Sequence, residues 1–172
     1  DGFTWRHWNA KRLLGFVNWH RQRRFVHDPA VVARLLADLH SQAPDHIAVT
    51  GDLVNIGLPR EHAAALGWLQ GIGAPGRVTV VPGNHDIYCD VGADPGVRRW
   101  QPYMASDAWG AGLIEGSNGF PFLRRVGRIA IIGVNSAVPT PPAIATGRVG
   151  EEQLARLGRL LEKLAHEAVF RL

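Results

Sequence analysis

Two short apolar runs, each ending in glycine and a polar side chain, constrain the fold of this chain more than any other feature. The first is IAVTGD, residues 47–52, and the second is VTVVPGN, residues 78–84. Apolar, β-branched runs that close in a glycine turn are typical of buried strands. Residues 59–73 lie between them and predict a helix that ends near Gly71 or Gly73. This strand–helix–strand order indicates the α/β class, in which sites lie beyond the carboxyl ends of the strands.

The rest of the chain continues the alternation of helices and strands. Asp28 can cap a helix that begins at Pro29, and residues 120–126 and 128–136 predict an antiparallel pair that turns at Gly127. A short helix around 97–104, a long helix over 151–167 and a strand beginning at FRL (170–172) are also expected. Apolar residues at helical spacing predict core-facing sides for three helices: Leu13, Phe16, Val17 and His20 within 3–25; Leu35, Leu36 and Leu39; and Leu154, Leu157, Leu160, Leu161 and Leu164.

Size and composition are those of one globular domain, residues 1–172, because 46% of the residues are hydrophobic and can fill one sizeable core. The net charge is +4 and the pI is about 10, which favours anionic partners without choosing among them. The single cysteine, Cys89, excludes an internal disulfide framework and a cysteine-built zinc site. No apolar run approaches the roughly 18 residues of a membrane span, and we expect a cytoplasmic protein. Nothing in the sequence indicates an oligomeric state.

The polar residues after the two strand-like runs could bind metal and act on phosphate. Asp52 supplies a carboxylate that can bridge two cations, Asn84 a neutral carbonyl oxygen and His85 an imidazole. Hard oxygen ligands mixed with imidazole suit Mn²⁺, Fe or Zn²⁺. Two such ions close together would hold a phosphate and generate a nucleophilic water near neutral pH. We therefore expect two divalent metal ions as cofactors, with Asp52 and Asn84 as metal ligands.

His85 and Asp86 are the expected catalytic residues. His85 could contact a phosphate oxygen or protonate a leaving alkoxide. Asp86, the next residue, could hold the imidazole in one tautomer or favour its protonated form. Taken separately, a Gly-Asp turn and an Asn-His-Asp loop are also typical of polar turns whose side chains bond to the backbone. Together on two strands of one domain they point much more specifically to a site.

GDLVN (51–55) and GNHD (83–86) resemble two motifs of the calcineurin-like metallophosphoesterases. The resemblance implies an αββα sandwich with a binuclear metal centre and a metal-dependent hydrolysis of phosphomonoester or phosphodiester substrates. It further implies that Asp52 bridges both metals, that Asn84 binds the second metal and that His85 is the catalytic imidazole near the phosphate. Asn55 matches a position that is usually supporting in the family.

Other motifs of that family do not occur in these residues. No Asp-x-His precedes Gly51, and neither a lone histidine at a strand end nor Gly-His-x-His follows Asp86, where the later His166 falls in the last helix. We therefore expect a domain that is incomplete at both ends. Residues 1–172 alone are then expected to bind metals weakly and to turn over substrate slowly.

The N-terminal region supports an alternative, non-catalytic function. Its interleaved aromatic and basic residues could contact an anionic membrane surface or nucleic acid. The favoured interpretation is a helix packed on the domain with its arginines in water. Tyr88 and Cys89 could line the site, although packing is the expected role of Cys89. Six further histidines are expected to be structural or to face solvent. The aromatic and basic residues are Trp5, Trp8, Trp19, Phe25, Arg21, Arg23 and Arg24, and the histidines are His7, His20, His27, His40, His46 and His62.

Overall fold

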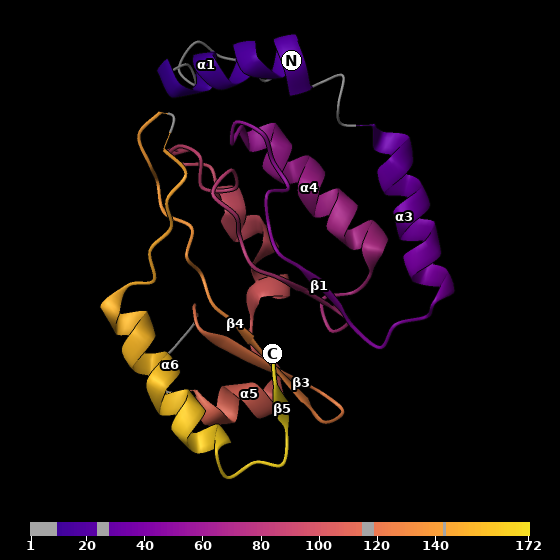
Figure 1. Ribbon diagram of the computed structural model, residues 1–172, viewed down its shortest axis with the longest axis vertical. Helices are drawn as coiled ribbons and strands as arrows, with labels where there is room; N and C mark the ends of the chain where they lie inside the picture. Colours follow the sequence, from indigo (N-terminus) through magenta and orange to yellow (C-terminus); the bar gives the residue numbers. More distant parts are fainter. Residues whose placement is uncertain (1–9, 24–27, 115–118, 143) are drawn as a thin grey trace.

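A computed structural model describes residues 10–23, 28–114, 119–142 and 144–172. Two small sheets form the middle of the molecule, with α3 and α4 on the side of β1 and with α5 and α6 on the side of β3 (Figure 1). This is the α/β class expected from the sequence. The elements are α1 (Ala10–Asn18), the π-helix η2 (Trp19–Arg23), α3 (Pro29–Ser41), β1 (Ile47–Val49), α4 (Pro59–Ile72), β2 (Val78–Val80), the 3₁₀ helix η3 (Gly96–Met104), α5 (Ala108–Leu113), β3 (Phe122–Val126), β4 (Ile129–Gly133), α6 (Glu151–Leu164) and β5 (Phe170–Arg171).

The first sheet consists of β1 and β2, which are parallel and joined by α4. Ile47 pairs with Val78 and Val49 with Val80. Helix α4 begins at Pro59, directly after its N-cap Leu58, and ends at Ile72 with Gly73 as its C-cap, which agrees with the end expected near Gly71 or Gly73. Because the strands are parallel, the turns that follow them meet at the same edge of the sheet. This topology brings the two glycine motifs together.

The second sheet has the order β3–β4–β5. Strands β3 and β4 are antiparallel and turn at Gly127, whose φ of +55° suits glycine, and both strands agree with the sequence prediction. The predicted strand in FRL is also present, as β5 pairs in parallel with β4. Helix α5 is not anticipated by the sequence reading, although Asp107 caps it by accepting a hydrogen bond from the Gly110 amide at 2.7 Å.

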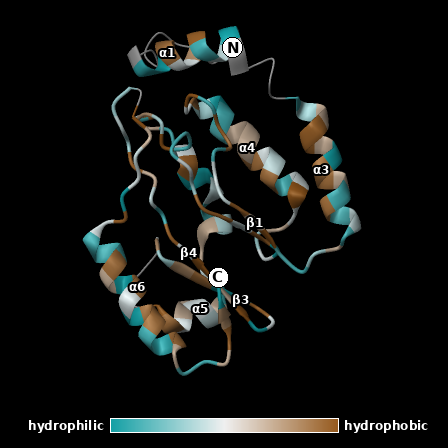
Figure 2. Ribbon diagram, in the orientation of Figure 1, coloured by the Kyte–Doolittle hydropathy of each residue, from teal (hydrophilic) through white to brown (hydrophobic). Residues whose placement is uncertain are grey.

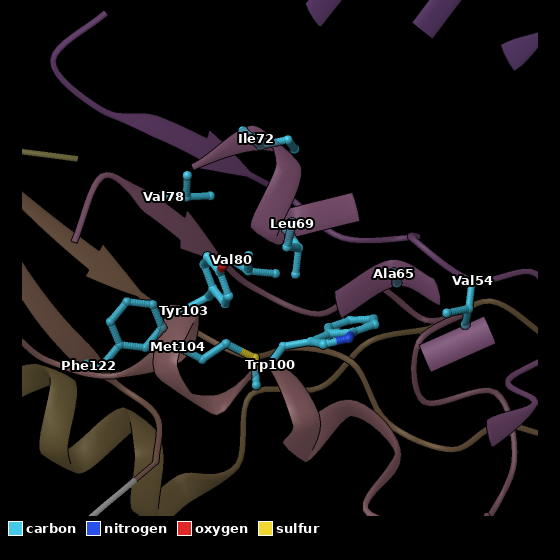
Figure 3. Close-up of a cluster of buried hydrophobic side chains, with 10 residues drawn as sticks. All are labelled: Val54, Ala65, Leu69, Ile72, Val78, Val80, Trp100, Tyr103, Met104 and Phe122. Atoms are coloured by element: carbon cyan, nitrogen blue, oxygen red, sulfur yellow. The ribbon is translucent and has the colours of Figure 1, made fainter. Parts of the chain in front are cut away.

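The main core lies between α4, the first sheet and η3. Figure 3 shows Trp100 and Tyr103 from η3 beside Leu69 and Val80. Each fully buried side chain of this size contributes roughly 1.5–3 kcal/mol. A second cluster joins the other sheet to α6. The main cluster contains Val54, Ala65, Leu69, Ile72, Val78, Val80, Trp100, Tyr103, Met104 and Phe122, and the second contains Leu123, Ala130, Leu160 and Leu164.

A buried arginine connects the two sheets. Arg124 of β3 is 6% exposed and donates to the carbonyl oxygens of Val78 at 2.7 Å, Pro102 at 2.8 Å and Ala105 at 2.6 Å. Its guanidinium also donates to the Pro75 carbonyl. Burial lowers the pKa of Arg124 below its ordinary value. One side chain thus satisfies carbonyl groups of β2, of η3 and of two loops.

Several predicted core faces are wrong in part. Leu13 of α1 is 50% exposed, Leu35 of α3 is 63% exposed and Leu154 of α6 is 49% exposed; Val17 and Leu161 are exposed as well. Figure 2 shows the resulting hydrophobic colour on α3, which has no buried residue. Helical spacing identifies residues that share a side of a helix, but it does not say how much of that side another element covers. Within the described residues, no helix has the length and apolar content that a membrane span requires.

His46 should make the stability of the fold depend on pH. Its Nε2 lies 2.7 Å from Thr79 Oγ1, and burial lowers the pKa of His46 below its ordinary value of 6.5, with Arg124 and Arg77 lowering it further. The unfolded chain therefore binds a proton at a higher pH than the folded chain, so stability is lost as the pH falls below 6.5.

We expect the urea midpoint to fall between about pH 7 and about pH 5, and to fall less in His46→Gln. His166→Gln, at an exposed position after α6, should retain the wild-type slope. Equal slopes for the wild type and His46→Gln would contradict this assignment.

Candidate active site

Two glycines allow the turns after β1 and β2 to touch. Gly51 has a φ of +96°, and a Cβ atom there would lie 2.1 Å from the Gly83 amide nitrogen. A Cβ at Gly83 would lie 2.2 Å from Asp52 Oδ1. Neither position has room for a side chain, and Gly51 also adopts a backbone conformation that other residues rarely adopt. The glycines of GDLVN and GNHD are therefore requirements of backbone contact.

Asp86 joins the two turns through four hydrogen bonds. Its Oδ2 accepts from the amides of Asp52 and Gly83, both at 2.8 Å. Its Oδ1 accepts from the amides of Leu53 at 2.8 Å and Val54 at 3.1 Å. The residue is only 3% exposed. Burial raises the pKa of the Asp86 carboxyl above its ordinary value, while the four amide donors act in the opposite direction.

The catalytic role expected for Asp86 beside the His85 imidazole stays a prediction, and the structure gives this carboxylate a structural role. Among the described residues, the hydrogen bonds of its carboxylate go to backbone amides. A turn that leaves its amides unpaired needs an acceptor, and a buried carboxylate needs several donors. These two requirements assign Asp86 to the scaffold of the site.

Asp52 and Asn84 present oxygen atoms at this edge of the sheet. Asp52 is exposed and has a φ of +58°, a conformation that aspartate and asparagine tolerate better than most residues. Its Oδ1 accepts from the His85 amide at 3.0 Å. Asn84 is half-buried, and within the described part of the chain its side chain makes no hydrogen bond. The structure thus brings Asp52, Asn84 and His85 to one place.

The His85 imidazole is held by a hydrogen bond to the GDLVN turn. Its Nδ1 lies 2.6 Å from the Asn55 carbonyl oxygen, which can only accept a hydrogen bond, so Nδ1 carries the proton. The Tyr88 ring stacks on the imidazole with a centroid distance of 5.3 Å and an angle of 13° between the planes. The supporting role expected for Asn55 is carried by its backbone carbonyl.

Glu61 and His62 of α4 support the same turns. Glu61 Oε2 accepts from the amides of Leu58 at 2.8 Å and Ile56 at 3.1 Å. His62 is buried, with Nδ1 at 3.0 Å from the Leu58 carbonyl and Nε2 at 3.0 Å from the Asp86 carbonyl. The structural role predicted for His62 is confirmed. The role of Glu61 could have been inferred, because a glutamate three residues after an N-cap commonly reaches back to the cap amide.

The side chains at this edge fit part of a metal site. Asp52 and Asn84 offer oxygen donors of the kind that Mn²⁺, Fe and Zn²⁺ accept together with imidazole. In residues 10–23, 28–114, 119–142 and 144–172, no three or more His, Cys, Asp or Glu side chains gather in a way that could hold an ion. The fit therefore rests on one carboxylate and one amide side chain.

Helix α1 packs over the loops around the site, and its cations point inward. Arg12 is buried and donates to the carbonyls of Ile56 at 3.2 Å and Gly57 at 2.8 Å. The favoured prediction of a packed N-terminal helix holds for α1, and the sequence analysis did not identify Arg12 as a residue that satisfies loop carbonyls. Arg21 and Trp19 are exposed. The side chains of Trp5, Trp8, Arg23, Arg24 and Phe25 lie outside the described residues.

The fold and the site define an α/β protein whose polar residues gather at the carboxyl ends of two parallel strands. The model of one family, calcineurin-like phosphoesterase, matches residues 19–148. Because this match covers more than half of the chain, the chain belongs to that family, as GDLVN and GNHD predicted. Its function is therefore of the metallophosphoesterase type. A search of curated proteins found no match, and a search of solved structures found none either.

Proposed function

We propose that this protein hydrolyses phosphomonoester or phosphodiester bonds with water and two divalent metal ions. The observation that carries the proposal is the Asp86 carboxylate, which bonds to amides of both motif turns and so gathers Asp52, Asn84 and His85 at one edge of the sheet. Membership of the calcineurin-like family supports the same class of reaction.

The roles of the three residues follow from their positions. Asp52 and Asn84 would hold the divalent ions through their side-chain oxygens. When bound, such ions supply an activated water and offset the charge of the phosphate. His85 keeps Nδ1–H on the Asn55 carbonyl, so an imidazolium that also carries a proton on Nε2 would pass that proton to the departing alkoxide and return to the neutral Nδ1–H form. The half-buried position of His85 allows this approach from the solvent side.

The test compares Asp52→Asn with His85→Ala in the full-length protein. Asparagine is the better replacement for Asp52, because it tolerates the φ of +58° and removes only the charge. Calorimetric titration with Mn²⁺ should show a loss of affinity of about tenfold or more in Asp52→Asn and a smaller loss in His85→Ala. Hydrolysis of bis(4-nitrophenyl) phosphate should fall by about 10²–10⁴ in kcat for His85→Ala.

Asp90→Asn is the matched control. Asp90 is exposed on the loop after GNHD, and its carboxylate accepts from the Gly92 amide at 2.8 Å. The control should keep both metal affinity and kcat. A larger loss of Mn²⁺ affinity in His85→Ala than in Asp52→Asn would overturn the assigned roles, and wild-type protein without hydrolysis of either a monoester or a diester would overturn the proposed function.

A further inference from the structure

Tyr88 stands where helix α1 meets the His85 imidazole, three residues after that histidine in the chain. Its amide donates to the His85 carbonyl at 3.2 Å, so the two residues share one tight turn. Its ring lies against the imidazole at 5.3 Å between centroids with nearly parallel planes. Tyr88 therefore contacts the flat face of the candidate catalytic imidazole, whereas the Asn55 hydrogen bond contacts its edge at Nδ1.

Lys11 of α1 holds Tyr88 at three points. The lysine Nζ lies 4.2 Å from the centroid of the Tyr88 ring and donates to the Tyr88 carbonyl at 2.9 Å. In return, the tyrosine hydroxyl donates to the Lys11 carbonyl at 3.2 Å. Lys11 Nζ also donates to the Thr140 carbonyl at 2.6 Å, which ties the loop after β4 into the same contact. Ring, backbone and hydroxyl of Tyr88 are all engaged by one residue.

Helix α1 is close enough to fix this arrangement. A Cβ at Gly15 would lie 2.9 Å from the Tyr88 hydroxyl and 2.7 Å from a methyl group of Ile56. One turn away, Arg12 donates to the carbonyls of Gly57 and, at 3.2 Å, Asp90. The helix is thus seated on the loops on both sides of His85. A movement of α1 would therefore change the contacts that Lys11 makes with Tyr88.

The stacked Tyr88 ring restrains the imidazole in a way that the hydrogen bond to Asn55 does not. The bond from Nδ1 to the Asn55 carbonyl fixes one atom of the ring, but the ring plane can still turn about that contact. A stacked aromatic ring limits that rotation, because offset-stacked rings lose contact area when one plane turns. Proton transfer depends on this orientation, since a displacement of about 1 Å can cost about 100-fold in rate.

We propose that Tyr88 is a positioning residue for the His85 imidazole and that Lys11 of α1 holds Tyr88 in place. The catalytic part of this inference rests on the proposed function, whereas the orientation of the ring does not. Helix α1 is then part of the active-site architecture, acting through one aromatic ring and without contact to the reacting atoms.

The test first measures how the Tyr88 ring lies against the His85 imidazole and then measures the rate of hydrolysis. Histidine side-chain NMR of the metal-free protein, with His85 signals assigned by their loss in His85→Gln, reports the ring-current shift from Tyr88. Tyr88→Phe should keep this shift, because it retains the ring and loses only the hydroxyl. Tyr88→Leu should abolish the shift. Lys11→Met should reduce it, and Lys163→Met, which removes a lysine donating to the Leu113 carbonyl in another part of the fold, should leave it unchanged.

Hydrolysis of bis(4-nitrophenyl) phosphate with Mn²⁺ should follow the same order. We expect kcat to fall by about 10–100-fold in Tyr88→Leu with little change in KM, and by less than about threefold in Tyr88→Phe. Unchanged His85 signals in Tyr88→Leu, or a shifted ring with unchanged kcat, would overturn the positioning role. The ring shifts could be as expected while the wild-type protein hydrolyses neither phosphomonoesters nor phosphodiesters. That result would overturn the proposed function alone and would leave the restraint on the His85 ring established.

Discussion

Replacing Asp86 with asparagine is expected to lower the free energy of unfolding by about 3–5 kcal/mol. The carboxylate accepts four amide hydrogen bonds from the two motif turns while it is almost fully buried. Asparagine has nearly the same shape, but its NH₂ group would face two of those amides, donor against donor. The variant therefore loses charge-assisted bonds and leaves buried N–H groups without an acceptor.

Urea denaturation followed by circular dichroism measures this loss. Asp90→Asn serves as the control, because the exposed Asp90 carboxylate caps a single amide and its replacement should change stability by less than about 0.5 kcal/mol. Equal midpoints for Asp86→Asn and Asp90→Asn would show that the four bonds are not needed to hold the turns together.

Replacing Arg124 with methionine is the second large effect, with an expected loss of about 3–4 kcal/mol in the free energy of unfolding. Methionine approximates the length of the arginine stem but donates no hydrogen bond. The carbonyls of Val78, Pro102 and Ala105 would then be left without their donor between the two sheets. An uncompensated set of buried acceptors is more costly than the loss of the same bonds at a surface.

The next residue of β3 provides a matched control. Arg125 is exposed, donates to the Gly127 carbonyl at 3.0 Å and lies over the Trp109 ring at 5.2 Å. Arg125→Met should cost less than about 1 kcal/mol. The same urea titration compares the two variants, and a loss in Arg125→Met as large as that in Arg124→Met would argue against a special role for the buried guanidinium.

The sequence predicted the elements that carry strong local signals. The cap at Asp28, the start of α4 at Pro59, the Gly127 hairpin and the two glycine turns all depend on the backbone preferences of a few neighbouring residues. The two predicted strands also place Asp52, Asn84 and His85 near one another, because neighbouring parallel strands end at the same edge of a sheet. These parts of the fold and the site required no knowledge of distant contacts.

The parts that the sequence did not predict depend on partners far along the chain. Asp86 bonds to amides 32–34 residues away, and no local pattern around it indicates these partners. The sequence pattern of β3 is equally compatible with an exposed or a buried side chain at Arg124. The packing of the two sheets is what buries this residue. Arg12 is buried in the same way, through carbonyl partners far along the chain. Periodicity cannot identify which long cationic side chain will reach a carbonyl inside the fold.

The four hydrogen bonds of Asp86 also determine how the site can move. Amides at the ends of two different strands share one acceptor, so neither turn can open without releasing the other. Local opening of a loop normally costs much less than global unfolding, but a shared buried acceptor raises that cost toward the stability of the sheet itself. The candidate catalytic edge is therefore expected to exchange its protected amides with solvent as part of a single cooperative unit that includes β1 and β2. Local opening at low free-energy cost should be confined to segments outside that unit.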